Sequence, residues 1–267
     1  MLRQIIALLS VFIIIFFSSC VSTHYGVGNF SHDTDVLQKP VDKEGEKERV
    51  QYITGKYNHS QQPVSNKFKS QQMGSMTYHL AENHRWYKIA GGGFLHGGSI
   101  DAISRNQVPG GHKYFLGGGL TGEFAVNIPA GMFEWRIIGV KMTALYENGK
   151  YNQFRKDVVD YPENGQLVTD DDEIYFEFET DLNPRGYNYN IGFTSEMVLQ
   201  FDKVGIAWAV ILGGGTGGSI TAGSRWLLTY DKFTFSFNNQ HRGALFETDT
   251  DTYYGFGLTY AFSRKKL

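Results

Sequence analysis

Several things that other protein classes require are scarce in this sequence. It holds one cysteine in 267 residues, so no intramolecular disulfide can form. Charged residues make up only 19% and the formal net charge is −2, which excludes a polyanion-binding protein and leaves no expectation of a nucleic-acid partner. There is one long apolar run, at the N-terminus, so a polytopic helical membrane protein is excluded as well.

The abundant residues are glycine and the aromatics. Glycine occurs 32 times, and aromatic side chains account for 15% of the chain. A disordered chain would lack these aromatics. High glycine and aromatic content with little charge favours β structure, so we expect an all-β fold.

The first twenty residues have the organisation of an export signal. Residues 1–4 include a basic residue, residues 5–17 are apolar, and two serines precede Cys20. The apolar run is too short to span a membrane comfortably, so residues 1–19 are predicted to be a signal peptide. The small residues followed by Cys20 resemble the lipobox of bacterial lipoproteins, although Phe17 stands where leucine is usual. This resemblance implies acylation of the Cys20 thiol.

Residues 20–48 are polar and carry charges of both signs. This composition predicts a flexible tether between the lipid and the folded domain. His24, His32, Asp33 and Asp35 lie in it, but a flexible stretch is a poor metal site. The sequence therefore predicts no metal and no other cofactor. The lipoprotein resemblance, with no retention signal in the residues after Cys20, implies an outer-membrane location with the lipid anchor on the periplasmic side.

From about residue 50 the dominant pattern is an alternation of apolar and polar residues. In residues 187–201 one face is almost wholly apolar with aromatic ends, and the other is polar or small. Such a period of two indicates β-strands, and about 15 residues at roughly 3.3 Å each are enough to cross a bilayer. Residues 49–262 are predicted to form about ten such strands, at 49–58, 72–81, 86–96, 113–128, 132–148, 187–201, 204–212, 222–230, 233–239 and 251–262.

The connections alternate between tight and long. Short turns are expected at 82–84, 129–131, 202–203 and 231–232, and long loops near 59–71, 97–112, 149–186, 213–221 and 240–250. Short turns on one side and long loops on the other are typical of outer-membrane barrels. We therefore expect an antiparallel up-and-down transmembrane β-barrel of about ten strands, with eight as the fallback. An even number puts both ends of the barrel domain on the short-turn side.

A soluble, lipid-tethered barrel of the lipocalin kind would also alternate. The polar face distinguishes the two, since a soluble barrel turns it to water and a small membrane barrel turns it into a crowded interior. Gly255, Gly257, Thr259 and Ala261 on the last strand suit the interior. Charged residues on the same face are expected to lock the barrel by pairing inside it: Lys88, Lys113, Glu123, Lys141, Glu196 and Arg225.

The end of the last strand carries a second motif. Gly257, Tyr260 and Phe262 resemble the C-terminal targeting strand of outer-membrane barrel proteins, with a basic tail at 263–267 added after the usual terminal phenylalanine. The resemblance implies recognition by the barrel-assembly machinery during biogenesis. With this motif and the lipobox together, the chain resembles uncharacterised outer-membrane lipoproteins of the Bacteroidota. This resemblance implies that outer-membrane lipids contact the barrel.

Catalytic constellations are few. His96 with Ser99 and Asp101, or His112 with Glu123, are the candidates for a hydrolytic set near strand ends. The family motifs of outer-membrane enzymes are missing, so no catalytic residue is predicted. The glycine run 213–218 matches the G-x-G-x-x-G pattern of dinucleotide-binding loops. Such a loop needs a helix after it to bind the phosphates, and a strand is expected here instead.

The longest loop, 149–186, is the expected site for a protein partner. It contains four consecutive acidic residues, 170–173, which favour a solvated loop with Ca²⁺ binding as the alternative. The alternating stretch 174–179 that follows is suited either to an extension of the barrel wall above the membrane or to an extra hairpin. The sequence thus favours a non-catalytic role in binding or scaffolding, with an accessory subunit of an outer-membrane complex as one form of it. A narrow solute channel and a lipid-modifying hydrolase or acyltransferase remain alternatives.

Overall fold

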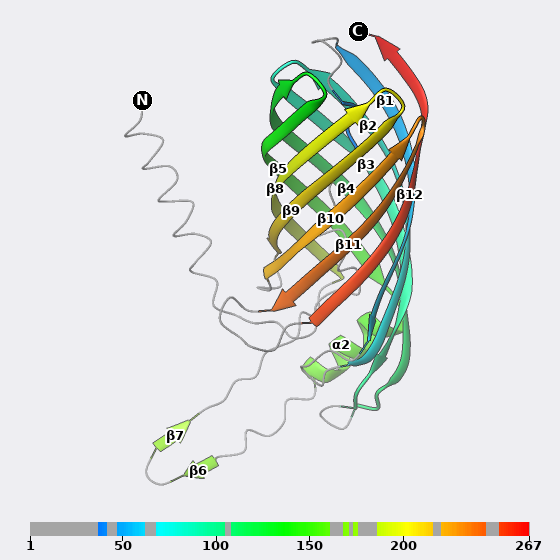
Figure 1. Cartoon of the computed structure of the whole chain (residues 1–267). Helices are drawn as coiled ribbons and strands as arrows, with labels where there is room; N and C mark the ends of the chain where they lie inside the picture. Colours follow the sequence, from blue (N-terminus) through cyan, green and yellow to red (C-terminus); the bar gives the residue numbers. More distant parts are fainter. Residues whose placement is uncertain are drawn as a thin grey trace.

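The computed structural model describes residues 37–41, 47–61, 68–104, 108–160, 168–170, 173–175, 186–215, 220–243 and 251–266. Within these residues, ten antiparallel strands close into one barrel (Figure 1), as predicted. They are β1 (Glu48–Gln61), β2 (Phe68–His84), β3 (Tyr87–Ala102), β4 (Gly111–Ala130), β5 (Phe133–Asn148), β8 (Tyr187–Phe201), β9 (Val204–Gly215), β10 (Ile220–Tyr230), β11 (Phe233–Gly243) and β12 (Asp251–Lys266).

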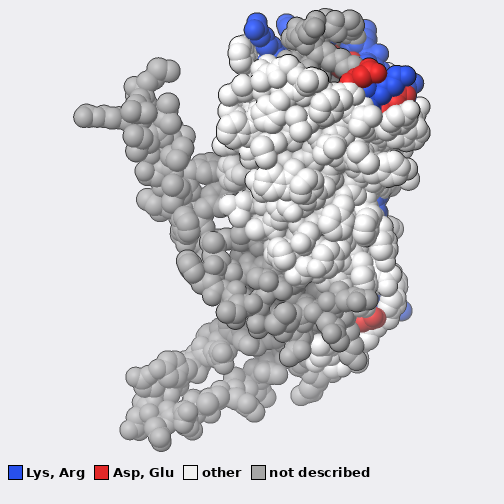
Figure 2. Space-filling view, viewed as in Figure 1, with Lys and Arg blue, Asp and Glu red and all other residues white. Residues whose placement is uncertain are grey.

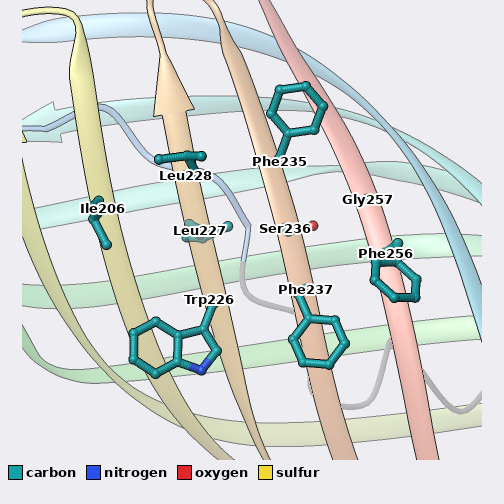
Figure 3. Close-up of a pocket in the computed structure, with 9 residues that line it drawn as sticks. All are labelled: Ile206, Trp226, Leu227, Leu228, Phe235, Ser236, Phe237, Phe256 and Gly257. Atoms are coloured by element: carbon teal, nitrogen blue, oxygen red, sulfur yellow. The ribbon is translucent and has the colours of Figure 1, made fainter.

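The outer wall of the barrel is apolar. Figure 3 shows Trp226, Phe235 and Phe256 around a shallow groove of about 390 Å³ on the outside of neighbouring strands. The alternating residues Leu227 and Ser236 are buried on the other side. Charged residues gather at the end of the barrel with the short turns, and the side wall in Figure 2 is almost free of them. This is the arrangement of a barrel whose outer wall contacts lipid acyl chains, because a charged side chain on the lipid-facing surface destabilises the barrel.

The two ends of the barrel differ. At one, the short-turn end, turns lie at 85–86, 131–132, 202–203 and 231–232. The turn at 85–86 lies just beyond its predicted position at 82–84, and the turn at 131–132 overlaps the predicted 129–131 in one residue. The turns at 202–203 and 231–232 match the prediction. Both termini of the barrel are at this end, where Glu48 pairs with Lys266 to close the sheet. Residues 263–266, predicted as a tail, continue β12 and pair with β1.

The opposite end, the long-loop end, has longer strands than expected. β2 begins at Phe68 and β3 runs to Ala102, so much of the predicted loops 59–71 and 97–112 is sheet. The predicted loop 149–186 contains a helix, α2 (Lys150–Asp160), and a separate hairpin of β6 (Val168–Asp170) and β7 (Glu173–Tyr175). Among the described residues, no helix has the length and apolar character to cross a membrane.

Two glycine positions make room for rings inside the barrel. A Cβ on Gly119 would lie 2.2 Å from the carbonyl oxygen of Ala144 and 2.8 Å from the Phe94 ring. A Cβ on Gly117 would lie 2.7 Å from the imidazole of His96. Glycine is therefore required where these inward rings cross the neighbouring strand.

Candidate functional site

The barrel interior is polar and heavily charged. Five of the six charged residues predicted to face inward are fully buried there: Lys88, Glu123, Lys141, Glu196 and Arg225. The sixth, Lys113, holds its Nζ 5.5 Å from the centre of the Phe154 ring near the long-loop end. The prediction of an inward polar face is confirmed.

Five residues from the predicted tether lie inside the barrel. Leu37 packs among Val50, Tyr52, Ala81 and Ala90 on β1, β2 and β3. Val41 packs against a second apolar group on β8, β9 and β10, made of Val198, Ala207 and Leu227. These strand groups lie on opposite walls of the closed ring, separated on each side by two strands. Residues Leu37–Val41, the luminal segment, therefore cross the bore, and the remainder of the predicted tether up to residue 36 lies outside the described residues.

The backbone of the luminal segment is held by side chains of the wall. The amide of Leu37 donates to Glu123 Oε2 at 2.8 Å, and His79 Nε2 donates to the carbonyl of Gln38 at 3.0 Å. Arg136 donates to the carbonyls of Lys39 and Pro40, both at 3.3 Å, and Lys88 also donates to Pro40. Side chains of the wall thus supply hydrogen-bond partners to the backbone of the luminal segment, which does not pair with the sheet as a further strand.

The side chain of Lys39 completes a network of buried ion pairs. Its ammonium group contacts Glu123 directly and lies 4.0 Å from Glu196. Arg136 bonds Glu196 and lies 2.6 Å from Glu134, which in turn accepts from Lys88 at 2.9 Å. Three cations and three carboxylates are therefore matched across the bore, as buried charges require. The predicted pairing of interior charges is confirmed for Lys88, Glu123 and Glu196.

The luminal segment also borders open space. A cavity of about 230 Å³ is lined by Gln38 to Val41 on one side and by the turn residues Asp202, Lys203, Asp231 and Lys232 on the other. These turn residues belong to the short-turn end. The luminal segment is therefore approached from that end of the barrel.

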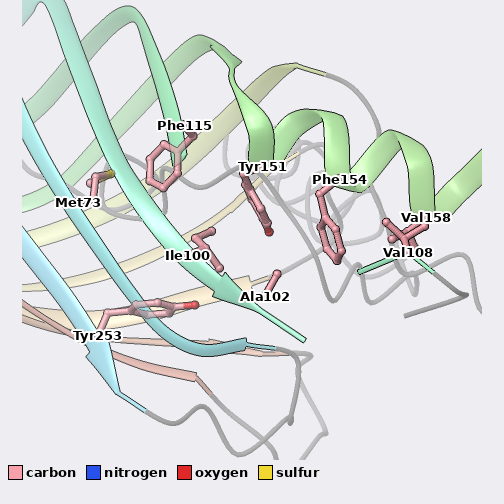
Figure 4. Close-up of a cluster of buried hydrophobic side chains, with 9 residues drawn as sticks. All are labelled: Met73, Ile100, Ala102, Val108, Phe115, Tyr151, Phe154, Val158 and Tyr253. Atoms are coloured by element: carbon pink, nitrogen blue, oxygen red, sulfur yellow. The ribbon is translucent and has the colours of Figure 1, made fainter. Parts of the chain in front are cut away.

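Near the long-loop end, α2 packs across inward-facing side chains of the wall. Figure 4 shows Tyr151 and Phe154 of the helix beside Phe115 and Ile100 of the wall, within a buried apolar cluster that also contains Met73, Ala102, Val108, Val158 and Tyr253. Arg155 of the helix donates to Glu147 Oε1 at 2.9 Å, with both side chains fully buried. The helix is thus fastened to β5 by an ion pair and to the wall by aromatic packing.

The two catalytic sets considered from sequence are not assembled. His96 is buried in the interior, where its imidazole lies 3.8 Å from Glu147. Ser99 is an odd number of residues along β3, so it faces the opposite side of the sheet. Glu123 binds the luminal segment, whereas His112 is exposed at the long-loop end of β4.

A different polar set forms on the outside of that end. His112 Nδ1 lies 2.9 Å from Asp101, and the hydroxyl of Ser70 donates to the same carboxylate at 2.6 Å. A nucleophilic serine requires its hydroxyl to bond to the imidazole, with the acid behind it. Here the serine hydroxyl bonds to the acid. In the described part of the chain, no group of three or more metal-ligating side chains is present.

The remaining predicted sites are placed as follows. Gly257, Tyr260 and Phe262 lie in β12, and their targeting role stays a prediction. Cys20 lies outside the described residues. Asp170 and Glu173 are partners in the backbone register of the β6–β7 hairpin. The structure does not describe the side chains of residues 170–173. Of the glycine run 213–218, residues 213–215 belong to β9, and β10 begins at Ile220, so the residues described on either side of 216–219 are strand rather than helix.

Lys39, Glu134 and Arg136 were missed by the sequence reasoning. Two of them do carry a signal, because Glu134 and Arg136 alternate with the outward Trp135 on β5. For Lys39 the signal is weaker: the apolar residues Leu37 and Val41 flank it in a mostly polar stretch.

Comparison with known proteins adds little. No family model and no curated protein matches the chain. Solved structures that resemble it include the KdgM porin, with a TM-score of 0.30 and 11% identity over 80% of this chain and 99% of that one. They also include the β-domain of the Bordetella autotransporter BrkA, with a TM-score of 0.42 and 7% identity over 80% and 99% of the two chains. LpxR from Salmonella typhimurium matches with a TM-score of 0.32 and 9% identity over 80% and 100%.

These likenesses are too distant to carry an activity to this chain. The class of protein follows from the fold itself: a closed antiparallel barrel with an apolar wall and a polar interior is a transmembrane β-barrel of the outer-membrane type.

Proposed function

We propose that the protein is a closed outer-membrane barrel that binds partners at its long-loop end and does not conduct solutes. The observation that carries this proposal is the double obstruction of the bore, by the luminal segment from one side and by α2 from the other. A narrow channel needs a continuous polar path. Charged residues that line the bore are instead engaged with each other and with Lys39.

The proposal includes the location and anchoring predicted from sequence. The short-turn end, with its charged turns, would face the periplasm as in other outer-membrane barrels. Acylation of Cys20 would then add an anchor on the same side as both ends of the barrel domain. The region 149–186 would face outward, where the described surface consists of α2 and the β6–β7 hairpin.

Planar-bilayer recording tests the closed state. Purified protein is expected to give no current steps above the lipid-only baseline, because the bore is obstructed at two levels. A variant lacking both 37–41 and 150–160 is the matched control for an opened barrel, and heat-dependent gel mobility checks that each preparation contains folded barrel. Stable ohmic steps from the intact protein would overturn the proposal.

Photo-crosslinking tests the binding role. Lys156 is an exposed residue of α2, so a photoreactive amino acid at this position is expected to capture one defined partner in intact cells. The same substitution at Leu120, on the apolar outer wall of β4, is the control and is expected to give no such product. Equal products from both positions, or none from Lys156, would count against binding through the long-loop end.

A further inference from the structure

The wall around the luminal segment has the properties of a peptide-binding site. Backbone groups of four successive residues are met by buried side chains, at the Leu37 amide and at the carbonyls of Gln38, Lys39 and Pro40. The Lys39 side chain enters a pocket between Glu123 and Glu196. Backbone contacts accept any extended chain, whereas a pair of carboxylates selects a cation.

The charges of the wall also decide what can replace the luminal segment. Removing one member of a buried ion pair leaves its partner uncompensated, which is strongly destabilising, whereas the pair itself adds little net stability. Loss of the luminal segment without replacement would leave Glu123 without its Lys39 partner. If a second extended peptide with lysine at the same position replaced the luminal segment, every buried ion pair would be kept. The replacement would therefore change the stability of the barrel little.

Proline at position 40 fits the same reasoning. It lacks a backbone N–H, so it presents no donor that the buried wall would have to satisfy. Its carbonyl accepts from both Lys88 and Arg136. The sequence Leu-Gln-Lys-Pro-Val at 37–41 therefore matches the wall at an apolar residue, a lysine, a proline and a second apolar residue.

We propose that the lumen is a receptor site for an extended, lysine-containing peptide segment of a partner protein, and that Leu37–Val41 occupy it in cis as an autoinhibitory ligand. The cavity between the luminal segment and the Asp202–Lys203 and Asp231–Lys232 turns gives the route of entry, so the partner approaches from the short-turn end. The partner is recognised by a lysine followed by proline between two apolar side chains. This inference is independent of the conductance proposal, because exchange of one peptide for another leaves α2 in place.

The test cuts the covalent link between the luminal segment and the barrel after folding, so that a separate peptide can compete for the site. A protease site is introduced between residues 42 and 46, the full chain is folded in detergent with the luminal segment in place, and the site is then cut. The probe is the acetylated peptide Leu-Gln-Lys-Pro-Val with a fluorophore at its C-terminal end, toward the cavity. Fluorescence anisotropy is expected to rise on addition of cut protein and to stay low with uncut protein.

The controls address recognition of the lysine. A peptide with norleucine in place of lysine is expected to bind at least tenfold more weakly, and Glu123→Gln in the cut protein is expected to abolish the preference between the two peptides. Uncut Lys39→Gln protein provides a second route, since its own segment fits less well and should admit the lysine peptide. Equal binding of both peptides to cut protein, or no binding of the lysine peptide to either the cut or the Lys39→Gln protein, would overturn the proposal.

Discussion

Replacing Arg136 with methionine is expected to destabilise the folded barrel by about 3–5 kcal/mol, the usual effect of removing one partner of a buried ion pair. Arg136 links the luminal segment to the buried ion pairs of the wall. It binds the carboxylates of Glu134 and Glu196 and the carbonyls of Lys39 and Pro40. Methionine is unbranched like the stem of arginine but is shorter and has no donor, so two buried carboxylates would lose a cation at once.

The measurement is a urea titration in detergent, followed by tryptophan fluorescence and by the gel mobility of unboiled samples. Lys203→Gln, at an exposed turn, is the matched control and should change the free energy of unfolding by less than about 0.5 kcal/mol. The double variant Arg136→Met with Glu196→Gln should recover part of the loss, because the carboxylate that loses its closest cation is also removed. An Arg136→Met protein as stable as the Lys203→Gln control would mean that the luminal network does not hold the barrel.

Leu120→Arg is expected to destabilise the membrane-embedded barrel by about 2–4 kcal/mol, the cost of a cation at the bilayer midplane on the lipid face of a barrel. Leu120 lies in the middle of β4 and is 71% exposed on the outer wall. The same outward exposure would be harmless in a soluble barrel, where arginine would be hydrated. The substitution therefore separates the two classes of barrel.

Tyr230→Arg is the matched control for depth. Tyr230 is also exposed on the outer wall but is the last residue of β10, beside a short turn. Near the interface the cost of arginine falls to about 0–1 kcal/mol. Folding into phospholipid vesicles, followed by heat-dependent gel mobility against urea concentration, gives both values. Similar costs at the two positions would contradict a wall surrounded by lipid.

Much of the barrel could be predicted from local pattern. Alternation in residues 187–201 identified both β8 and the side of it that faces outward, because the period of two links a position in the sequence directly to a face of the sheet. The inward positions of Lys88, Glu123 and Glu196 followed in the same way. Strand ends were less well predicted, since the hairpins continue past the membrane, where alternation weakens.

The helix and the luminal segment could not be predicted by that pattern. Tyr151, Phe154 and Val158 recur at helical spacing within α2, a signal obscured by the polar residues around it in a region expected to be a loop. Two apolar residues, Leu37 and Val41, are the only local difference between the luminal segment and the charged residues that follow it, and they do not predict burial in a barrel. The residues that bind it come from β2, β3, β4, β5 and β8, so the site exists only after the sheet has closed.

By itself, the sequence determined the class of fold, the two faces of each strand and the charged character of the interior, because each depends on neighbours one or two residues apart. It favoured ten strands and left eight as the alternative. The tertiary structure decided what fills the bore and which charges meet, since those contacts join residues tens of positions apart, such as Lys39 and Glu123. Burial is the physical reason. An interior charge requires a partner, and only the closed barrel determines which groups are near enough to serve.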